Sequence, residues 1–162
     1  MSAKMTLLFL AALGLATPTL SGFDLQASAQ ESVIAVPVTP GIQTNLTGKQ
    51  GLAPFEIVTS PGYDYLVKLV DFTSSRDVMT IYVTGGVPLE VLVPLGSYGM
   101  KYASGVVWQG GAALFGPETS YSKTDDVFTF IEDSQGYSGY TVELILQTDG
   151  NLTTEAINAD EF

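Results

Sequence analysis

The sequence predicts an all-β protein with one domain, either an antiparallel β-sandwich or a small barrel, preceded by a signal peptide. Three observations support this. The 162 residues suit a single domain, and they include 17 Gly, 8 Pro, 8 Tyr and 8 Phe, a composition rich in turn formers and aromatics. Short runs of alternating apolar and polar residues recur between residues 55 and 148, separated by Gly and Pro. After the first thirty residues no segment keeps a helical period with caps.

The first 29 residues are predicted to be a secretory signal peptide. Lys4 precedes an apolar run at residues 5–16, and Ala27-Ser28-Ala29 fits a cleavage site that leaves Gln30 as the mature N-terminus. Residues 14–16 offer an earlier site. The apolar run is shorter than the ~20 residues that a membrane helix needs, so no stable span is expected once the leader is removed. We therefore expect a periplasmic or secreted protein.

Residues 30–53 form a polar stretch that is expected to be a flexible lead-in or an edge strand. The strand candidate within it is residues 33–38, where Pro37 would suit an edge. The sandwich itself is expected over residues 54–148, and residues 149–162 form a polar C-terminal tail.

The sandwich is expected to contain six to nine short strands. Residues 65–70 are apolar on nearly both faces, as in a central strand. Gly85-Gly86 predicts a hairpin between residues 78–84 and 89–93. The remaining strand candidates are residues 55–58, 98–103, 127–131 and 140–147, with two more short strands around Gly110-Gly111 in residues 106–116.

The stretch from Pro88 to Tyr102, PLEVLVPLGSYGMKY, resembles the strand–P-x-G-x-Y–strand hairpin of PEGA-like and carboxypeptidase-regulatory-like (transthyretin-like) modules. The resemblance covers residues 88–102. It implies an immunoglobulin- or transthyretin-like sandwich with an accessory role outside the cytoplasm, and it assigns no site residue. The whole chain also looks like a small exported bacterial protein.

Composition excludes several kinds of chemistry. The chain has no His and no Cys, so a Ser-His-Asp triad, a thiol nucleophile, a thiolate zinc site and a disulfide are all ruled out. The formal net charge is −11, and the five Lys and Arg after residue 30 are scattered in the sequence, which argues against nucleic acid. No cofactor is expected.

Aromatic side chains are the main candidates for ligand binding. Trp108 precedes Gln109-Gly110-Gly111 in an expected loop, and Tyr98 and Tyr102 would share one strand face with Met100. Exposed planar rings can stack on sugars or anchor a protein, and the acidic surface would favour a basic partner. The alternative is that these rings pack the core or its rim.

Acidic residues offer two weaker candidates. Asp125, Asp126 and Asp133 flank the strand candidate at residues 127–131 and could contribute oxygen ligands to Ca²⁺, although solvated turn acids explain them as well. Glu90 and Glu143 lie in the middle of strands and could serve a carboxylate-dependent polysaccharide hydrolase, although outward-facing strand positions explain them as well.

The function that these observations favour is an exported, non-catalytic binding or accessory module. It would present aromatic residues on a β scaffold to an envelope protein or a glycan. The alternatives are the polysaccharide hydrolase and a structural or assembly protein, in which the segments before Phe55 and after Asp149 pair with the edge strand of another chain.

Overall fold

The computed structural model describes residues 33–144 and 153–162. The predicted signal peptide, the end of the strand expected at 140–147 and the start of the predicted tail lie outside the described residues. Within the described residues, no helix has the length and apolar character needed to cross a bilayer.

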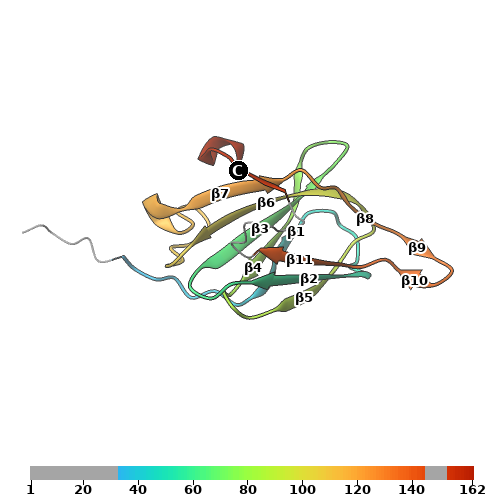
Figure 1. Ribbon diagram of the computed structural model, residues 1–162, viewed down its shortest axis with the longest axis horizontal. Helices are drawn as coiled ribbons and strands as arrows, with labels where there is room; N and C mark the ends of the chain where they lie inside the picture. Colours follow the sequence, from blue (N-terminus) through green and yellow to red (C-terminus); the bar gives the residue numbers. More distant parts are fainter. Residues whose placement is uncertain (1–32, 145–152) are drawn as a thin grey trace, which may run out of the picture. The chain divides into compact units, whose positions relative to one another are not determined.

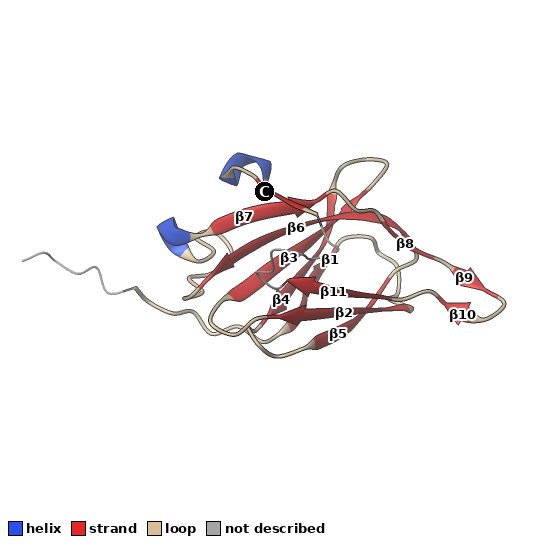
Figure 2. Ribbon diagram, viewed as in Figure 1, coloured by secondary structure: helices blue, strands red, loops and turns tan. Residues whose placement is uncertain are grey.

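The described residues form twelve strands and two short 3₁₀ turns, which confirms the all-β prediction (Figure 2). The strands are β1 (Gly41–Asn45), β2 (Ala53–Thr59), β3 (Asp64–Asp71), β4 (Asp77–Val83), β5 (Leu89–Val93), β6 (Gly96–Gly105), β7 (Ser120–Thr124), β8 (Phe128–Phe130), β9 (Glu132–Asp133), β10 (Gly136–Tyr137), β11 (Tyr140–Leu144) and β12 (Thr154–Ala156). The 3₁₀ turns are η1 (Gly116–Glu118) and η2 (Ala159–Glu161).

Two sheets make up the sandwich, and a small hairpin of β9 and β10 projects from it (Figure 1). The seven-stranded sheet has the order β1-β4-β3-β6-β7-β12, with β8 also paired to β6. The three-stranded sheet has the order β11-β2-β5. The pairing is antiparallel throughout the described sheets except between β11 and β2, which run parallel. These two strands are far apart in the sequence, so no tight turn forces them to be antiparallel.

One hydrophobic core lies between the two sheets, which identifies the architecture as a sandwich. In β2, every second side chain is buried, from Ala53 through Phe55 and Ile57 to Thr59. The facing sheet contributes Val67 of β3, together with the other core residues Leu69, Met79, Ile81, Val83, Tyr98 and Met100. Each fully buried apolar side chain of this size stabilises the fold by about 1.5–3 kcal/mol. The seven-stranded sheet stays open, because β1 and β12 are at opposite ends of its order.

The expected hairpin around Gly85-Gly86 is wrong, because β4 and β5 belong to different sheets. The chain crosses the sandwich at this turn instead. The Gly85 N–H donates to the Asp64 carboxylate at 2.9 Å, and the Gly86 N–H donates to the Thr59 hydroxyl at 3.1 Å. Residues 88–102 differ from the expected hairpin in the same way, since β5 pairs with β2 while β6 pairs with β3. The turn residues therefore predicted where the chain bends, but they did not predict which sheet each strand joins.

The strand expected at residues 33–38 is not a strand. This lead-in does not pair as a strand, because Pro37 has no N–H to donate and the Val36 N–H bonds to the Trp108 carbonyl at 2.8 Å. The edge strand of this region is β1, farther along the chain, which pairs with β4.

Candidate functional site

The outer face of the seven-stranded sheet carries a second apolar cluster, separate from the core between the sheets. Leu66 of β3, Tyr82 of β4 and Ala103 of β6 are neighbours across the strands, and Phe115 covers them. β3 therefore buries side chains on both faces, as expected of a central strand. Half-buried residues pack around this outer cluster, namely Val38, Trp108, Leu114, Tyr121 and Phe162.

A compact loop at residues 106–119 places Trp108 and Phe115 on this face. Two short strands were expected here, but the segment forms turns followed by η1. The Gln109 N–H bonds to the Leu114 carbonyl at 2.6 Å, and the Leu114 N–H bonds to the Gly110 carbonyl at 2.7 Å. Gly110 has a φ of 97°, which favours glycine at this position. These local hydrogen bonds satisfy the main chain without a partner strand.

Close packing of Phe115 against β6 depends on Gly105. A Cβ atom added at Gly105 would lie 2.2 Å from the Phe115 Cβ. We therefore expect Gly105→Ala to push Phe115 out of the outer cluster and to lower the free energy of unfolding by about 1–3 kcal/mol. Urea unfolding followed by circular dichroism measures the loss. Gly111→Ala in the same loop, where an added Cβ meets nothing within 4 Å, is the matched control. Equal effects of the two substitutions would contradict this packing.

Trp108 contacts two rings of the outer cluster. Its indole lies 5.2 Å from the Tyr82 ring and 5.2 Å from the Phe115 ring, both in edge-to-face geometry. Of the lead-in residues, Val38 packs on the same cluster, and the Val36 N–H donates to the Trp108 carbonyl at 2.8 Å. The indole is thus held in place by β4, the loop and the lead-in, while remaining partly exposed.

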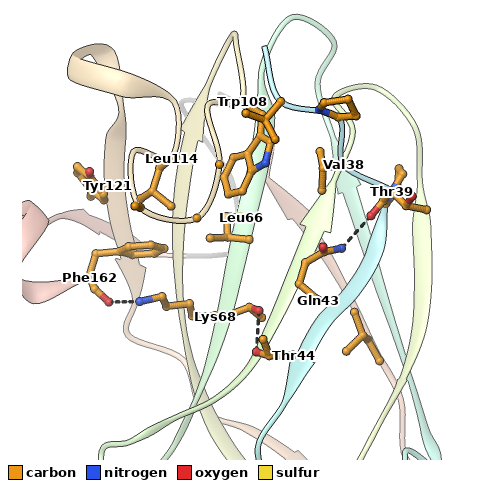
Figure 3. Close-up of a pocket in the computed structure, with 18 of the residues that line it drawn as sticks. Val38, Thr39, Gln43, Thr44, Leu66, Lys68, Trp108, Leu114, Tyr121 and Phe162 are labelled. Carbon is orange, nitrogen blue, oxygen red and sulfur yellow. Dashed lines mark hydrogen bonds between the residues drawn. The ribbon is translucent and has the colours of Figure 1, made fainter. Parts of the chain in front are cut away.

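A groove of about 1000 Å³ runs over this face beside Trp108 (Figure 3). Its walls come from the lead-in and β1, from the loop at 106–119 and from the last residues of the chain. Leu66 and Lys68 of β3 lie beneath it, as the close-up shows. Polar groups line one side: the Thr44 and Thr80 hydroxyls are 2.8 Å apart, and the Gln43 side-chain amide donates to the Thr39 carbonyl at 2.8 Å. The groove thus combines apolar and hydrogen-bonding surface.

A smaller cavity of about 320 Å³ adjoins Trp108 and reaches Tyr82 and Asp64. The Tyr82 hydroxyl donates to one carboxylate oxygen of Asp64 at 2.6 Å, and the Gly85 N–H donates to the other oxygen at 2.9 Å. Burial raises the pKa of Tyr82 well above its usual value, and the hydrogen bond to Asp64 raises it further. Tyr82 therefore stays neutral wherever the chain is folded under ordinary conditions.

This raised pKa of Tyr82 predicts a loss of stability in alkali. The folded chain holds the phenol proton more tightly than the unfolded chain, so the stabilisation is complete below the unfolded pKa of about 10 and is lost as the pH rises toward the folded value. We expect the free energy of unfolding to fall above pH 10 by up to about 1.4 kcal/mol per pH unit from Tyr82. Urea unfolding at several pH values should show a shallower slope for Tyr82→Phe. An unchanged slope would contradict the role of Tyr82. Burial also raises the pKa of Tyr65 and of Tyr98, so these two residues account for the alkaline loss of stability that the Tyr82→Phe chain retains.

The structure does not bring the three aromatic candidates together. Trp108 borders the groove, but Tyr98 is 4% exposed and lies between the two sheets with Met100. Tyr102 points to the same inner side and packs against the Tyr65 ring at 6.1 Å. Tyr98 and Tyr102 do share a face with Met100, as expected, but that face is the core. Neither tyrosine lines the groove.

The acidic candidates lie apart from the groove. Asp125 and Asp126 are exposed between β7 and β8, whereas Asp133 is in the projecting hairpin, where its carboxylate accepts the Gln135 N–H at 2.8 Å. Across residues 33–144 and 153–162, no three acidic residues come close enough to hold a metal ion. Glu90 and Glu143 are exposed on the three-stranded sheet, and neither lines the groove.

A row of lysines crosses the outer face of the seven-stranded sheet, and the sequence alone does not predict it. Lys68 of β3 is opposite Lys101 of β6, and Lys101 is opposite Lys123 of β7. These cations are scattered in the sequence, and only the strand register gathers them. Strand alternation in the sequence indicates that each lysine points away from the core. That the three lysines form a row follows only once the order of the strands in the sheet is known.

Comparison of the chain with models of protein families, with curated proteins and with solved structures finds no match. The family that residues 88–102 suggest therefore stays a prediction, although the hairpin expected there does not form.

Proposed function

We propose that this chain is an exported, non-catalytic binding module whose ligand occupies the groove beside Trp108. The observation that carries the proposal is the groove itself. Its volume of about 1000 Å³ is large enough for a ligand, and segments distant in the sequence build it on the seven-stranded sheet. Trp108 supplies an anchored ring that is only partly covered.

The chemistry of the lining favours a glycan. A sugar ring presents C–H groups on its faces and hydroxyls at its edge, so it needs an aromatic or apolar surface next to hydrogen-bonding groups. Trp108 and Leu114 provide the first, and Gln43, Thr44 and Thr80 provide the second. Among the described residues that line the groove, none is Asp or Glu, so the carboxylate pair of a glycoside hydrolase is not assembled there. This supports binding without hydrolysis.

Trp108 provides a direct test, because it is the only tryptophan in the sequence. We expect its fluorescence to shift and saturate with at least one member of a panel of oligosaccharides that includes those of bacterial envelopes. Calorimetry with that oligosaccharide should show about a tenfold or greater loss of affinity for Trp108→Ala. Tyr63→Ala, an exposed aromatic outside the groove, is the matched control and should bind normally.

The same panel separates the alternatives. If the chain retains an envelope protein, Trp108→Ala abolishes that retention and no oligosaccharide binds, the ligand is a protein and not a glycan. No binding to either class would overturn the proposal.

For the export step, mass spectrometry of the processed chain should show Gln30 as its first residue.

A further inference from the structure

The last ten residues of the sequence cover the free edge of β7. This tail segment, Thr153–Phe162, contributes β12, which pairs antiparallel with β7 so that Glu155 is opposite Lys123. Main-chain hydrogen bonds extend the pairing at both ends, from the Asp125 N–H to the Thr153 carbonyl at 3.3 Å and from the Ile157 N–H to the Tyr121 carbonyl at 3.1 Å. The tail segment thus behaves as a strand added to the edge of the sheet.

Each lysine of the row contacts the tail segment. The Lys123 ammonium lies 3.0 Å from the Glu155 carboxylate, and this hydrogen bond raises the pKa of Lys123. Lys101 donates to the carbonyl oxygen of Glu161, and Lys68 donates to the main-chain oxygen of Phe162 at 2.6 Å. Lys68 also pairs with Asp77 at 2.9 Å. Like charges on neighbouring strands repel, so the row needs anionic or carbonyl oxygens against it.

An aromatic contact completes the docking. The Phe162 ring lies 5.3 Å from the Tyr121 ring, and the Lys68 ammonium is 4.1 Å above the Phe162 ring. The remaining residues of the tail segment are mostly exposed; Ile157 and Phe162 are half-buried. A segment held by a short ladder, one ion pair, two lysine hydrogen bonds and one ring has few buried apolar contacts, and such segments open at low cost in free energy.

We propose that the β7 edge and the lysine row form a docking surface for an acidic, aromatic segment of another polypeptide, which adds to β7 in place of the tail segment. A peptide fits better than a glycan, because the edge of β7 offers main-chain N–H and C=O groups that only another main chain pairs in register. Charge favours an acidic segment at this surface. The row holds three of the chain's 6 Lys and Arg, whereas the net charge of −11 makes the rest of the protein repel acidic segments.

The inference stands apart from the glycan proposed for the groove. The two sites adjoin, however, because Lys68 of the lysine row also lies beneath the groove, and Ala159 and Phe162 of the tail segment form one of its walls. Replacing the tail segment by a partner would therefore open that wall. The test below uses a peptide and no glycan, so it can fail without affecting the groove proposal.

The test uses the full chain and a labelled, C-terminally amidated peptide with the sequence of residues 153–162, TTEAINADEF. The tail segment competes with the peptide for the same surface, so variants that weaken the tail segment should strengthen peptide binding. By fluorescence anisotropy we expect Phe162→Ala, and separately Glu155→Gln, to lower the apparent Kd of the peptide about tenfold. Glu155 is exposed and Phe162 is half-buried, so both variants should fold, and circular dichroism is the check on this.

The receptor side gives the opposite expectation. In the Phe162→Ala background, Lys101→Ala should weaken peptide binding about tenfold, and added salt should weaken it in the chain that retains Lys101. Lys49→Ala, a cation outside the row, is the matched control and should have no effect. A peptide with Lys in place of both glutamates should not bind.

Two results would overturn the proposal. One is that neither tail variant binds the peptide more tightly than the unaltered chain. The other is a chain that binds no peptide but forms a concentration-dependent dimer, seen by light scattering. That result would mean that two copies of the chain exchange their tail segments.

Discussion

We expect Phe55→Ala to lower the free energy of unfolding by about 3–5 kcal/mol. Phe55 is fully buried in β2, the middle strand of the three-stranded sheet. Its ring lies 5.9 Å from Phe128 and 5.7 Å from Phe130, so it joins the small sheet to β8 of the large one. Removing the ring leaves a cavity that β2 cannot collapse into, because β5 and β11 hold it on both sides. Urea unfolding followed by circular dichroism measures the loss.

Two further substitutions calibrate this result. Phe55→Leu keeps most of the volume and should cost less than half as much as the alanine variant. Val87→Ala removes an exposed side chain, which is 56% accessible, and should change stability by no more than about 0.5 kcal/mol. A loss below about 1 kcal/mol for Phe55→Ala would mean that the two sheets do not close over this residue.

Strand positions could be predicted from the sequence because alternation is local. The apolar residues of 65–70 and 78–84 predicted strands that the structure places as β3 and β4, with Val67 and Ile81 in the core. The two-faced burial of β3 followed from the same pattern, since Leu66 and Val67 point to opposite sides. These inferences need no knowledge of distant partners.

Sheet membership could not be predicted in this way. Gly85-Gly86 is compatible with a hairpin and with a crossing between sheets, and the structure shows the crossing. The deciding contacts come from residues distant in the sequence: Asp64 and Thr59 accept the two glycine N–H groups. The parallel pairing of β11 with β2 is equally non-local. Local turn chemistry fixes where the chain bends, and packing fixes where it goes next.

In the candidate site, too, local features could be predicted from the sequence and non-local ones could not. Trp108 was singled out as an aromatic residue in a loop, and the structure places it beside the groove. Tyr98 and Tyr102 were assigned correctly to one face, but which face meets the other sheet depends on strands that the pattern does not identify. The lysine row exists only because β3, β6 and β7 are neighbours in register.

Phe115→Ala should disrupt the outer cluster while leaving the core between the sheets intact. Phe115 is 4% exposed and contacts Trp108 and Tyr82, so we expect a loss of about 3 kcal/mol in the free energy of unfolding, at the low end for such a substitution. The loop at 106–119 has no partner strand, so the loss of this ring should free it locally. Hydrogen exchange at the Gln109 and Leu114 amides, which bond within the loop, should then accelerate.

The amide of Val67 in β3 serves as the internal reference. It lies in a strand paired on both sides and should keep its protection relative to the global free energy of unfolding. Trp108 emission should shift to longer wavelength, because the indole loses one of its two ring contacts. Phe115→Leu, which keeps apolar volume over Ala103, is the control and should show a smaller change in both measurements. Equal acceleration at Val67 and in the loop would show that the outer cluster and the core unfold as one unit, and that the groove is not an independently ordered surface.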